Sequence, residues 1–171
     1  MNIETVYKGM LELINNYSWG GACYASTAIM HAVLKLSGID SKPCIGVVEC
    51  INGEKFDHAW LEVNDKKYDV AIPYPLGNST VSEFVEPCGF YGVSDTPNFA
   101  YGIDMDLDSE ADFISQAFSN IMNACPFWGD GCDYWDVAEF FAKFFGIDVE
   151  KDDLVNALND SIWYVQREIK A

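Results

Sequence analysis

The stretch Gly20-Gly21-Ala22-Cys23-Tyr24-Ala25-Ser26-Thr27 decides the fold of this chain. A glycine pair interrupts the chain, and a helical pattern then begins at Ala22 or Cys23 and stops before Gly38. The apolar stripe of this pattern consists mostly of alanines, and such small side chains allow a helix to lie close against a sheet. The sequence therefore predicts a cysteine at the N-terminus of a helix that packs directly on a β-sheet.

The segments around this helix predict the other elements of an α+β fold. Apolar residues recur at helical spacing over residues 3–16, and residues 44–50 have the composition of a strand. Residues 56–63 and 67–72 form two further strand patterns on either side of Asn64-Asp65. A short turn of these residue types between two strands favours a β-hairpin.

The rest of the chain divides into a loop and a helical part. Residues 76–104 are rich in proline, glycine and aromatic residues, and an irregular segment of this length is more often functional surface or a lid than a linker. Residues 105–171 are predicted to form an acidic helical extension. Its helices are expected over residues 108–123, 133–145 and 149–169. With a core over residues 1–75, these parts make a single domain, the default for 171 residues.

The charge of the chain excludes several classes of partner. Its formal net charge is −17, and Arg167 is its one arginine, so nucleic acid and anionic lipid surfaces would repel it. No apolar run approaches the roughly 20 residues of a membrane span, and the N-terminus lacks the pattern of a secretory signal. We therefore expect a cytoplasmic protein that binds neither nucleic acid nor membrane. Attraction of a cationic partner is an open alternative to plain solubility.

The cysteines and histidines do not follow the spacing of a metal site. The chain has six cysteines without a Cys-x-x-Cys pair, and only two histidines, neither of which lies near a cysteine pair. This argues against zinc, and the cysteine spacing does not favour disulfides. Residues 104–112 begin like a calcium loop, but Ser109 and Ser115 occupy the positions that need glycine and glutamate. We expect a helix N-cap there, and His31 is expected to have only a structural role.

A cysteine, a histidine and an aspartate form the candidate catalytic group. Cys23 stands at a helix start, His58 in the strand pattern DHAWLEV, and Asp69 in the following pattern KYDV. The positive end of the helix dipole and a nearby imidazolium both favour a thiolate, which is the nucleophilic form of cysteine. The histidine can then donate a proton to the leaving group, while an acid holds its second ring nitrogen.

The hairpin register tests whether the aspartate can reach the histidine. A two-residue or four-residue turn places His58 opposite Ala71 and Trp60 opposite Asp69, so His58 and Asp69 become diagonal neighbours on one face. A three-residue turn would move Asp69 to the other face and separate the two side chains. The alternation Ala59, Leu61, Val63 toward the core agrees with the first arrangement.

These motifs resemble the transglutaminase-like branch of the papain-like cysteine enzymes. The match covers Gly-x-Cys, Asp-His-Ala-Trp-Leu-Glu-Val and Tyr-Asp-Val within residues 18–72. The resemblance implies a helix carrying the cysteine on an antiparallel sheet, with Cys23 as nucleophile, His58 as base and acid, and Asp69 as the residue that orients the ring. Leader peptidases of lasso-peptide biosynthesis look similar. Arylamine N-acetyltransferases do so more distantly, but they have arginine and glutamate where Trp19 and Ala25 stand.

The secondary features of the site are predicted from position alone. The backbone N–H of Cys23 is the first candidate donor to an oxyanion. A second donor is expected from Trp19, Tyr17 or Asn16. The substrate cleft is expected to include four aromatic side chains: Trp60, Tyr74, Phe90 and Tyr91.

The sequence thus predicts a thiol-dependent peptidase or amidase that acts through an acyl-enzyme on a peptide or protein substrate. It requires no metal or organic cofactor. A transglutaminase or another acyltransferase could use the same three residues, with an amine in place of water. A binding module that keeps the fold without turnover is another alternative, and docking of a basic protein on the acidic helical part is a third.

Overall fold

The central helix of the molecule is α2 (Cys23–Leu36), which is buried along most of its length. In the computed structural model, which describes residues 1–85 and 98–170, it packs against strand β2 (Lys55–Val63) and helix α5 (Tyr134–Phe144). The helix begins at the cysteine, as predicted. Its small side chains are fully enclosed: Ala25, Ala28 and Ala32.

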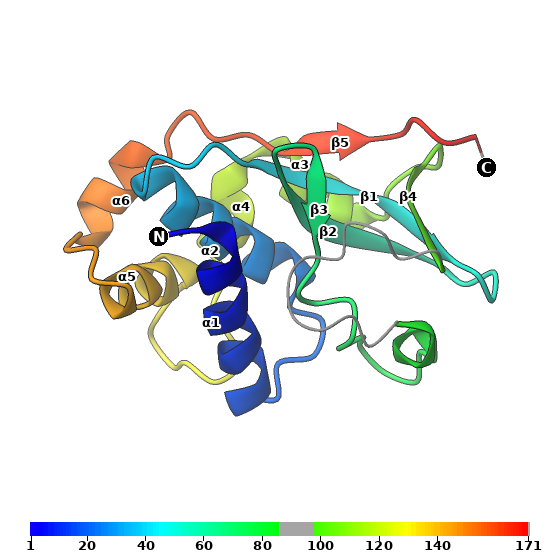
Figure 1. The fold of residues 1–171 in the computed structure, drawn as a ribbon, viewed down its shortest axis with the longest axis horizontal. Coiled ribbons are helices and arrows are strands. Elements are labelled where there is room, and N and C mark those ends of the chain that lie inside the picture. The colour runs from blue at the N-terminus through cyan, green and yellow to red at the C-terminus, as the bar shows by residue number, and fades with distance from the viewer. Residues whose placement is uncertain (86–97, 171) are drawn as a thin grey trace.

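The sheet has five strands in the described part of the chain, in the order β3-β2-β1-β4, with β5 also paired to β1. Strand β1 (Lys42–Cys50) runs antiparallel to β2 and to β4 (Phe99–Ile103). Strand β5 (Tyr164–Gln166) pairs in parallel with the first half of β1. Figure 1 shows β5 running alongside β1 and helices α1, α2, α5 and α6 gathered at the other end of the molecule. The predicted α+β class is confirmed, and the sheet is mixed.

The hairpin forms with the predicted two-residue turn. Asn64 and Asp65 have φ angles of 50° and 60°, the left-handed conformation that a tight turn of this kind needs at both positions. Strand β3 (Lys66–Tyr68) therefore pairs with β2 in the expected register, with Val63 opposite Lys66. The ladder ends at Tyr68, so the predicted strand over residues 67–72 is too long.

The C-terminal part contains less helix than predicted. Residues 108–123 form two helices, α3 (Ser109–Gln116) and α4 (Phe118–Met122), separated at Ala117, whose backbone is extended. The predicted helix over residues 149–169 is wrong beyond α6 (Lys151–Ala157), because the chain then extends to form β5. The free edge of β1 supplies hydrogen-bond partners that a local sequence pattern cannot reveal.

The segment predicted to be irregular also contains regular structure. Residues 76–104 include a short 3₁₀ helix, η1 (Val81–Phe84), and strand β4 on the edge of β1. The acidic run before α3 provides the expected N-cap, since Asp108 accepts a bond from the backbone N–H of Ala111 at 2.8 Å.

The core lies on both faces of the sheet. The larger cluster includes α2, the helix α1 (Ile3–Asn16) and the inward residues of β2: Ala59, Leu61 and Val63. The opposite face holds a second, smaller cluster around Trp60, Phe99 and Tyr101. The alternation predicted for β2 is therefore confirmed, and both of its faces are covered. None of the helices in the described residues combines the length and apolar character that crossing a bilayer requires.

Candidate functional site

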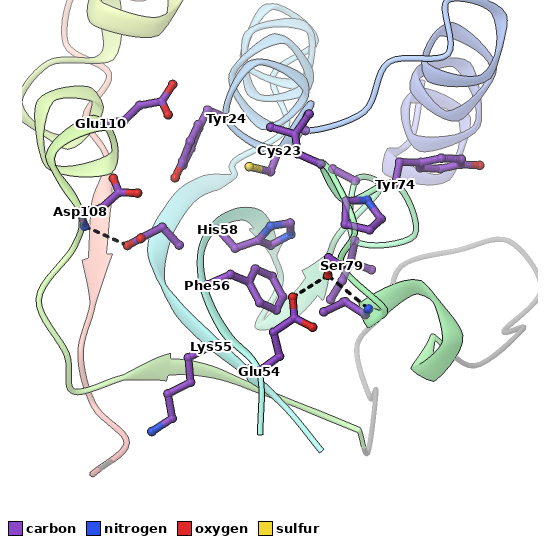
Figure 2. Close-up of a pocket in the computed structure, with 17 residues that line it drawn as sticks. Cys23, Tyr24, Glu54, Lys55, Phe56, His58, Tyr74, Ser79, Asp108 and Glu110 are labelled. Atoms are coloured by element: carbon purple, nitrogen blue, oxygen red, sulfur yellow. Dashed lines mark hydrogen bonds between the residues drawn. The ribbon is translucent and has the colours of Figure 1, made fainter. Parts of the chain in front are cut away.

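A cavity of about 460 Å³ opens where the start of α2 meets β2. The residues that line it come from four places: the start of α2, strand β2 with the residues just before it, the segment 71–81 that follows β3, and the start of α3. Figure 2 shows the Cys23 sulfur and the His58 ring directed into this common space. The topology thus brings residues far apart in the sequence to one pocket.

Cys23 is the first residue of α2, and its side chain is only 8 % exposed. The N-cap residue, Ala22, has no side chain that can cap the helix. The backbone N–H groups of the first helical turn have no partner within a helix, so they and the helix dipole create a positive environment at the cysteine. The local structure therefore favours an anion at the position of the thiol.

A glycine is required just before this helix. Gly21 has a φ angle of 68°, and a Cβ atom there would lie 2.4 Å from Cγ of Leu76. The backbone N–H of Gly21 donates to the carbonyl of Tyr74 at 3.0 Å. The glycine pair in the sequence thus marks a close approach between the start of α2 and the segment that follows β3.

His58 is held by Asp69, as the hairpin register predicts. Nε2 of His58 lies 2.9 Å from Oδ1 and 2.8 Å from Oδ2 of Asp69, and both side chains are buried. Because Asp69 occupies Nε2, the remaining ring nitrogen that can serve Cys23 is Nδ1. The structure therefore brings together the three residues that the sequence predicted: thiol, imidazole and carboxylate.

The Asp69 carboxylate is fixed by further donors. Oδ1 accepts bonds from the backbone N–H groups of Ala71 at 3.2 Å and Ile72 at 3.0 Å, and Oδ2 accepts the hydroxyl of Tyr101 at 2.8 Å. The hydroxyl of Tyr7 also donates to the backbone carbonyl of Asp69. The sequence does not mark Tyr101 as part of the site, because its strand, β4, lies within the segment predicted to be a loop.

These contacts determine the charge of His58. Burial alone would lower the pKa of the imidazole, but the Asp69 carboxylate, with Cys23 as charge and hydrogen-bond partner, raises it to about 10. The ring is therefore an imidazolium at neutral pH. An imidazolium beside Cys23 is the partner that a thiolate needs.

The residues predicted as second oxyanion donors lie elsewhere. The Trp19 ring stacks on Tyr134, and its backbone N–H donates to the carbonyl of Ile14 at 2.9 Å. Tyr17 stacks on Trp128. Neither of these residues nor Asn16 lines the pocket, so the structure does not bring them to Cys23.

Of the four aromatic residues predicted for the cleft, one lies in the pocket. Tyr74 lines it. Trp60 is 1 % exposed and packs against Tyr101 in the second core cluster, away from the cavity. Phe90 and Tyr91 lie outside the described residues.

Tyr24 lines the pocket and is not among the residues predicted for the site. Burial raises the pKa of its phenol, and the acidic groups around it, chiefly Cys23 and Asp57, raise it further, so the hydroxyl remains a donor at every physiological pH. Its position directly after the cysteine was the available signal, but a tyrosine in a helix is read more naturally as core.

His31, the other histidine, is buried and does not line the Cys23 pocket. It is buried between two serines, with Nδ1 2.8 Å from the hydroxyl of Ser41 and Nε2 3.0 Å from that of Ser161. Burial lowers its pKa to about 4, so it is neutral at physiological pH. It therefore joins the C-terminal segment to the residue just before β1 and lies outside the Cys23 pocket.

The site as a whole is a cysteine at a helix start, an imidazolium on a strand and a buried carboxylate that fixes the imidazolium. Comparison with models of protein families, with curated proteins and with solved structures found no match.

Proposed function

We propose that this protein is a thiol-dependent hydrolase that cleaves an amide bond through an acyl-enzyme. One observation carries the proposal: Cys23, at the start of α2, shares a pocket with His58, whose Nε2 is bound to the buried carboxylate of Asp69. The proposal includes a transglutaminase-like core over residues 1–75. The cysteine helix, the histidine strand and the aspartate just after the next strand follow one another in the order that this resemblance implies.

In the first half of the reaction, the sulfur of Cys23 attacks the carbonyl carbon of the amide. The negative charge that develops on the oxygen is stabilised by the backbone N–H of Cys23, which points out of an uncapped helix end. The carbon–nitrogen bond then breaks, and Nδ1 of His58 donates its proton to the departing amine. The acyl group remains on Cys23 as a thioester, and His58 is neutral.

In the second half, His58 takes a proton from a water molecule as that water attacks the thioester. The carbon–sulfur bond breaks, the carboxylic acid leaves, and the thiolate–imidazolium pair is restored. Asp69 touches neither substrate nor sulfur in this scheme. It holds Nε2 so that Nδ1 faces the reacting atoms, and it stabilises the imidazolium.

The test is the rate at which each of the six cysteines is alkylated by iodoacetamide between pH 5 and 8, measured by mass spectrometry on the folded protein. A thiol with an ordinary pKa near 8.5 is about 0.3 % ionised at pH 6, so a fully formed thiolate supplies about 300 times more of the reactive species. A thiolate of lower pKa is also less nucleophilic, so we expect a rate advantage of about tenfold to 100-fold. We expect Cys23 to show this advantage over the exposed Cys125.

Two histidine variants make the test specific. His58→Gln should remove the advantage of Cys23 at pH 6, whereas His31→Gln, at the other histidine, should keep it. If Cys23 reacts no faster than Cys125 at pH 6, or if the advantage survives in His58→Gln, the proposed function is wrong. Where the advantage is found, product analysis with peptide amides decides between water and an amine as the acyl acceptor.

A further inference from the structure

The pocket around Cys23 has an excess of negative charge. The residues that line it include four with carboxylate side chains and one lysine. The acids are Glu54, Asp57, Asp108 and Glu110. The lysine, Lys55, points its ammonium group toward Glu49, which is not among the pocket residues, at 3.7 Å. The His58 imidazolium also lines the pocket, but its charge is paired with Asp69. The four acids therefore share a cavity with the proposed nucleophile and have little local compensation.

The donors that bind Glu54, Asp57 and Asp108 in the described residues are hydroxyl and backbone N–H groups. Glu54 accepts the hydroxyl of Ser79 at 2.6 Å, and Asp57 accepts the backbone N–H of Asp108 at 3.3 Å. Asp108 itself caps α3 by accepting a backbone N–H. Within residues 1–85 and 98–170, none of the ion pairs involves Glu54, Asp57, Asp108 or Glu110. Neutral donors orient a carboxylate but leave its charge in place.

Two groups on the acidic side of the pocket, Asp57 and Tyr24, are affected by this negative potential. Burial raises the pKa of Asp57, and the neighbouring charge of Asp108 raises it further. The pKa of Tyr24 is raised by burial and by the same carboxylates. Because like charges beside a cavity repel one another, a cation that enters the cavity is stabilised by all of them.

The opposite wall of the cavity is mainly apolar, although it also contains Ser79, which is bound to Glu54. It is built by the segment that follows β3 and by η1, and it includes Ile72, Leu76 and Val81. Figure 2 shows Tyr24, Asp108 and Glu110 on one side of Cys23, and Tyr74 on the other. A cavity with an apolar wall and an acidic wall fits a group with an aliphatic stem and a positive end, which is the chemistry of a lysine or arginine side chain.

We propose that the pocket selects peptides in which the residue beside the attacked carbonyl is lysine or arginine. The alkyl stem lies along Ile72 and Leu76, and the charged end is bound by Asp57, Asp108 and Glu110. This inference rests on the proposed function, since Cys23 supplies the attacking sulfur. An extended organic cation fits better than a metal ion, because in the described residues these acids do not converge as metal ligands would.

The experiment uses three thiol-reactive peptide ketones that differ only in the side chain beside the reactive carbonyl: lysine, norleucine and glutamate. Norleucine has the lysine stem without the charge, so the comparison isolates the charge. The rate of labelling of Cys23 is followed by mass spectrometry. We expect the lysine probe to react about tenfold faster than the norleucine probe, which corresponds to about 1.4 kcal/mol. The glutamate probe should be slowest, and added salt should narrow the differences.

Variants of single acids locate the effect. Asp57→Asn and Glu110→Gln should each reduce the preference for lysine over norleucine. The matched control is Asp112→Asn, which removes an acid of the same helix that does not line the pocket and should leave the preference unchanged. A preference that is equally reduced by Asp112→Asn would reflect the net charge of the protein and would overturn the assignment to the pocket.

The outcomes separate this inference from the proposed function. If the norleucine probe labels Cys23 in a His58-dependent manner but lysine gives no advantage, the hydrolase stands and the lysine preference is wrong. If an added primary amine instead speeds release of a neutral acyl group from Cys23, the acidic wall serves an acyl acceptor, and the preference is again overturned. If Cys23 has no His58-dependent reactivity with any probe or with iodoacetamide, the proposed function fails first.

Discussion

Replacing Asp69 with asparagine tests the electrostatic link between Asp69 and His58. Asparagine keeps the shape of the side chain and removes its charge. Burial lowers the pKa of His58, and among the influences that raise it the charge of Asp69 is the largest. The carboxylate is also almost fully enclosed, at 1 % exposure, so solvent screens it little. We therefore expect the pKa of His58 to fall strongly in the Asp69→Asn variant.

The size of the effect on stability follows from the two pKa values of His58. The pKa is about 10 in the folded protein and about 6.5 in the unfolded chain. Because the folded value is the higher one, the stabilisation is fully present below pH 6.5 and is lost as the pH rises toward 10. A group with these two values loses about 2 kcal/mol of its contribution between pH 6.5 and 8.5. The Asp69→Asn variant should lack most of this loss.

Urea denaturation at steps from pH 6.5 to 8.5 measures it in the Cys23→Ala background, alone and combined with Asp69→Asn or His58→Gln. This background is needed because a Cys23 thiolate in the folded protein would take up a proton on unfolding and so offset the proton released by His58. Both combined variants should show a flatter pH dependence of the free energy of unfolding than Cys23→Ala alone. Burial also raises the pKa of Cys44 to about 12, so this thiol lowers stability as well, but only above about pH 9, where it ionises in the unfolded chain. Parallel curves for Cys23→Ala with and without Asp69→Asn below pH 8.5 would refute the reasoning.

Three further predictions concern the surroundings of the site. Tyr101→Phe removes the hydroxyl that donates to Asp69 and should cost about 1–2 kcal/mol in a urea titration; an unchanged midpoint would contradict this. Gly46→Ala places a Cβ atom 2.7 Å from the backbone oxygen of Gln166, so β5 must shift, and thermal unfolding should report a loss of about 1–3 kcal/mol. His31→Gln should remove an acid-side loss of stability of about 3 kcal/mol between pH 6.5 and 4, because the folded pKa of His31, about 4, lies below the unfolded value; a wild-type acid slope in this variant would contradict it.

Local patterns were sufficient to predict the site because its three residues depend on local structure. The helix start is marked by glycines and the cysteine, and the phase of His58 relative to Asp69 depends only on the length of the turn at Asn64-Asp65. Side chains alternate between the two faces of a strand. Whether His58 and Asp69 share a face therefore depends only on whether the turn has an even or an odd number of residues. The pairing register of β2 and β3 therefore depends only on the residues in and beside the turn at Asn64-Asp65.

The elements that were missed depend on distant partners. Strand β5 forms because the edge of β1 is free to bind it, and β4 lies inside a segment whose composition suggested a loop. The burial of Trp60 has the same origin. Alternation predicts which face of β2 it occupies, but only the second cluster, with Tyr101 from β4, decides that this face is covered.

The predicted oxyanion donors show a second limit of prediction from sequence. Trp19 is close to Cys23 in sequence, and an indole N–H is a good donor. Its ring is nevertheless engaged by Tyr134, more than 100 residues later, on a helix that the sequence places correctly but cannot dock. Closeness in sequence therefore does not reveal that the Trp19 ring packs on Tyr134 and lies outside the Cys23 pocket.

The hydrogen bond from Gly21 to Tyr74 joins the two halves of the site. Gly21 lies two residues before the thiol, and Tyr74 belongs to the short segment that begins at Asp69. The amide proton of Gly21 can exchange with solvent only when that segment separates from the start of α2. The exchange rate of this proton in deuterated water therefore measures how often the segment that begins at Asp69 separates from the helix start that carries Cys23. The measurement needs no substrate.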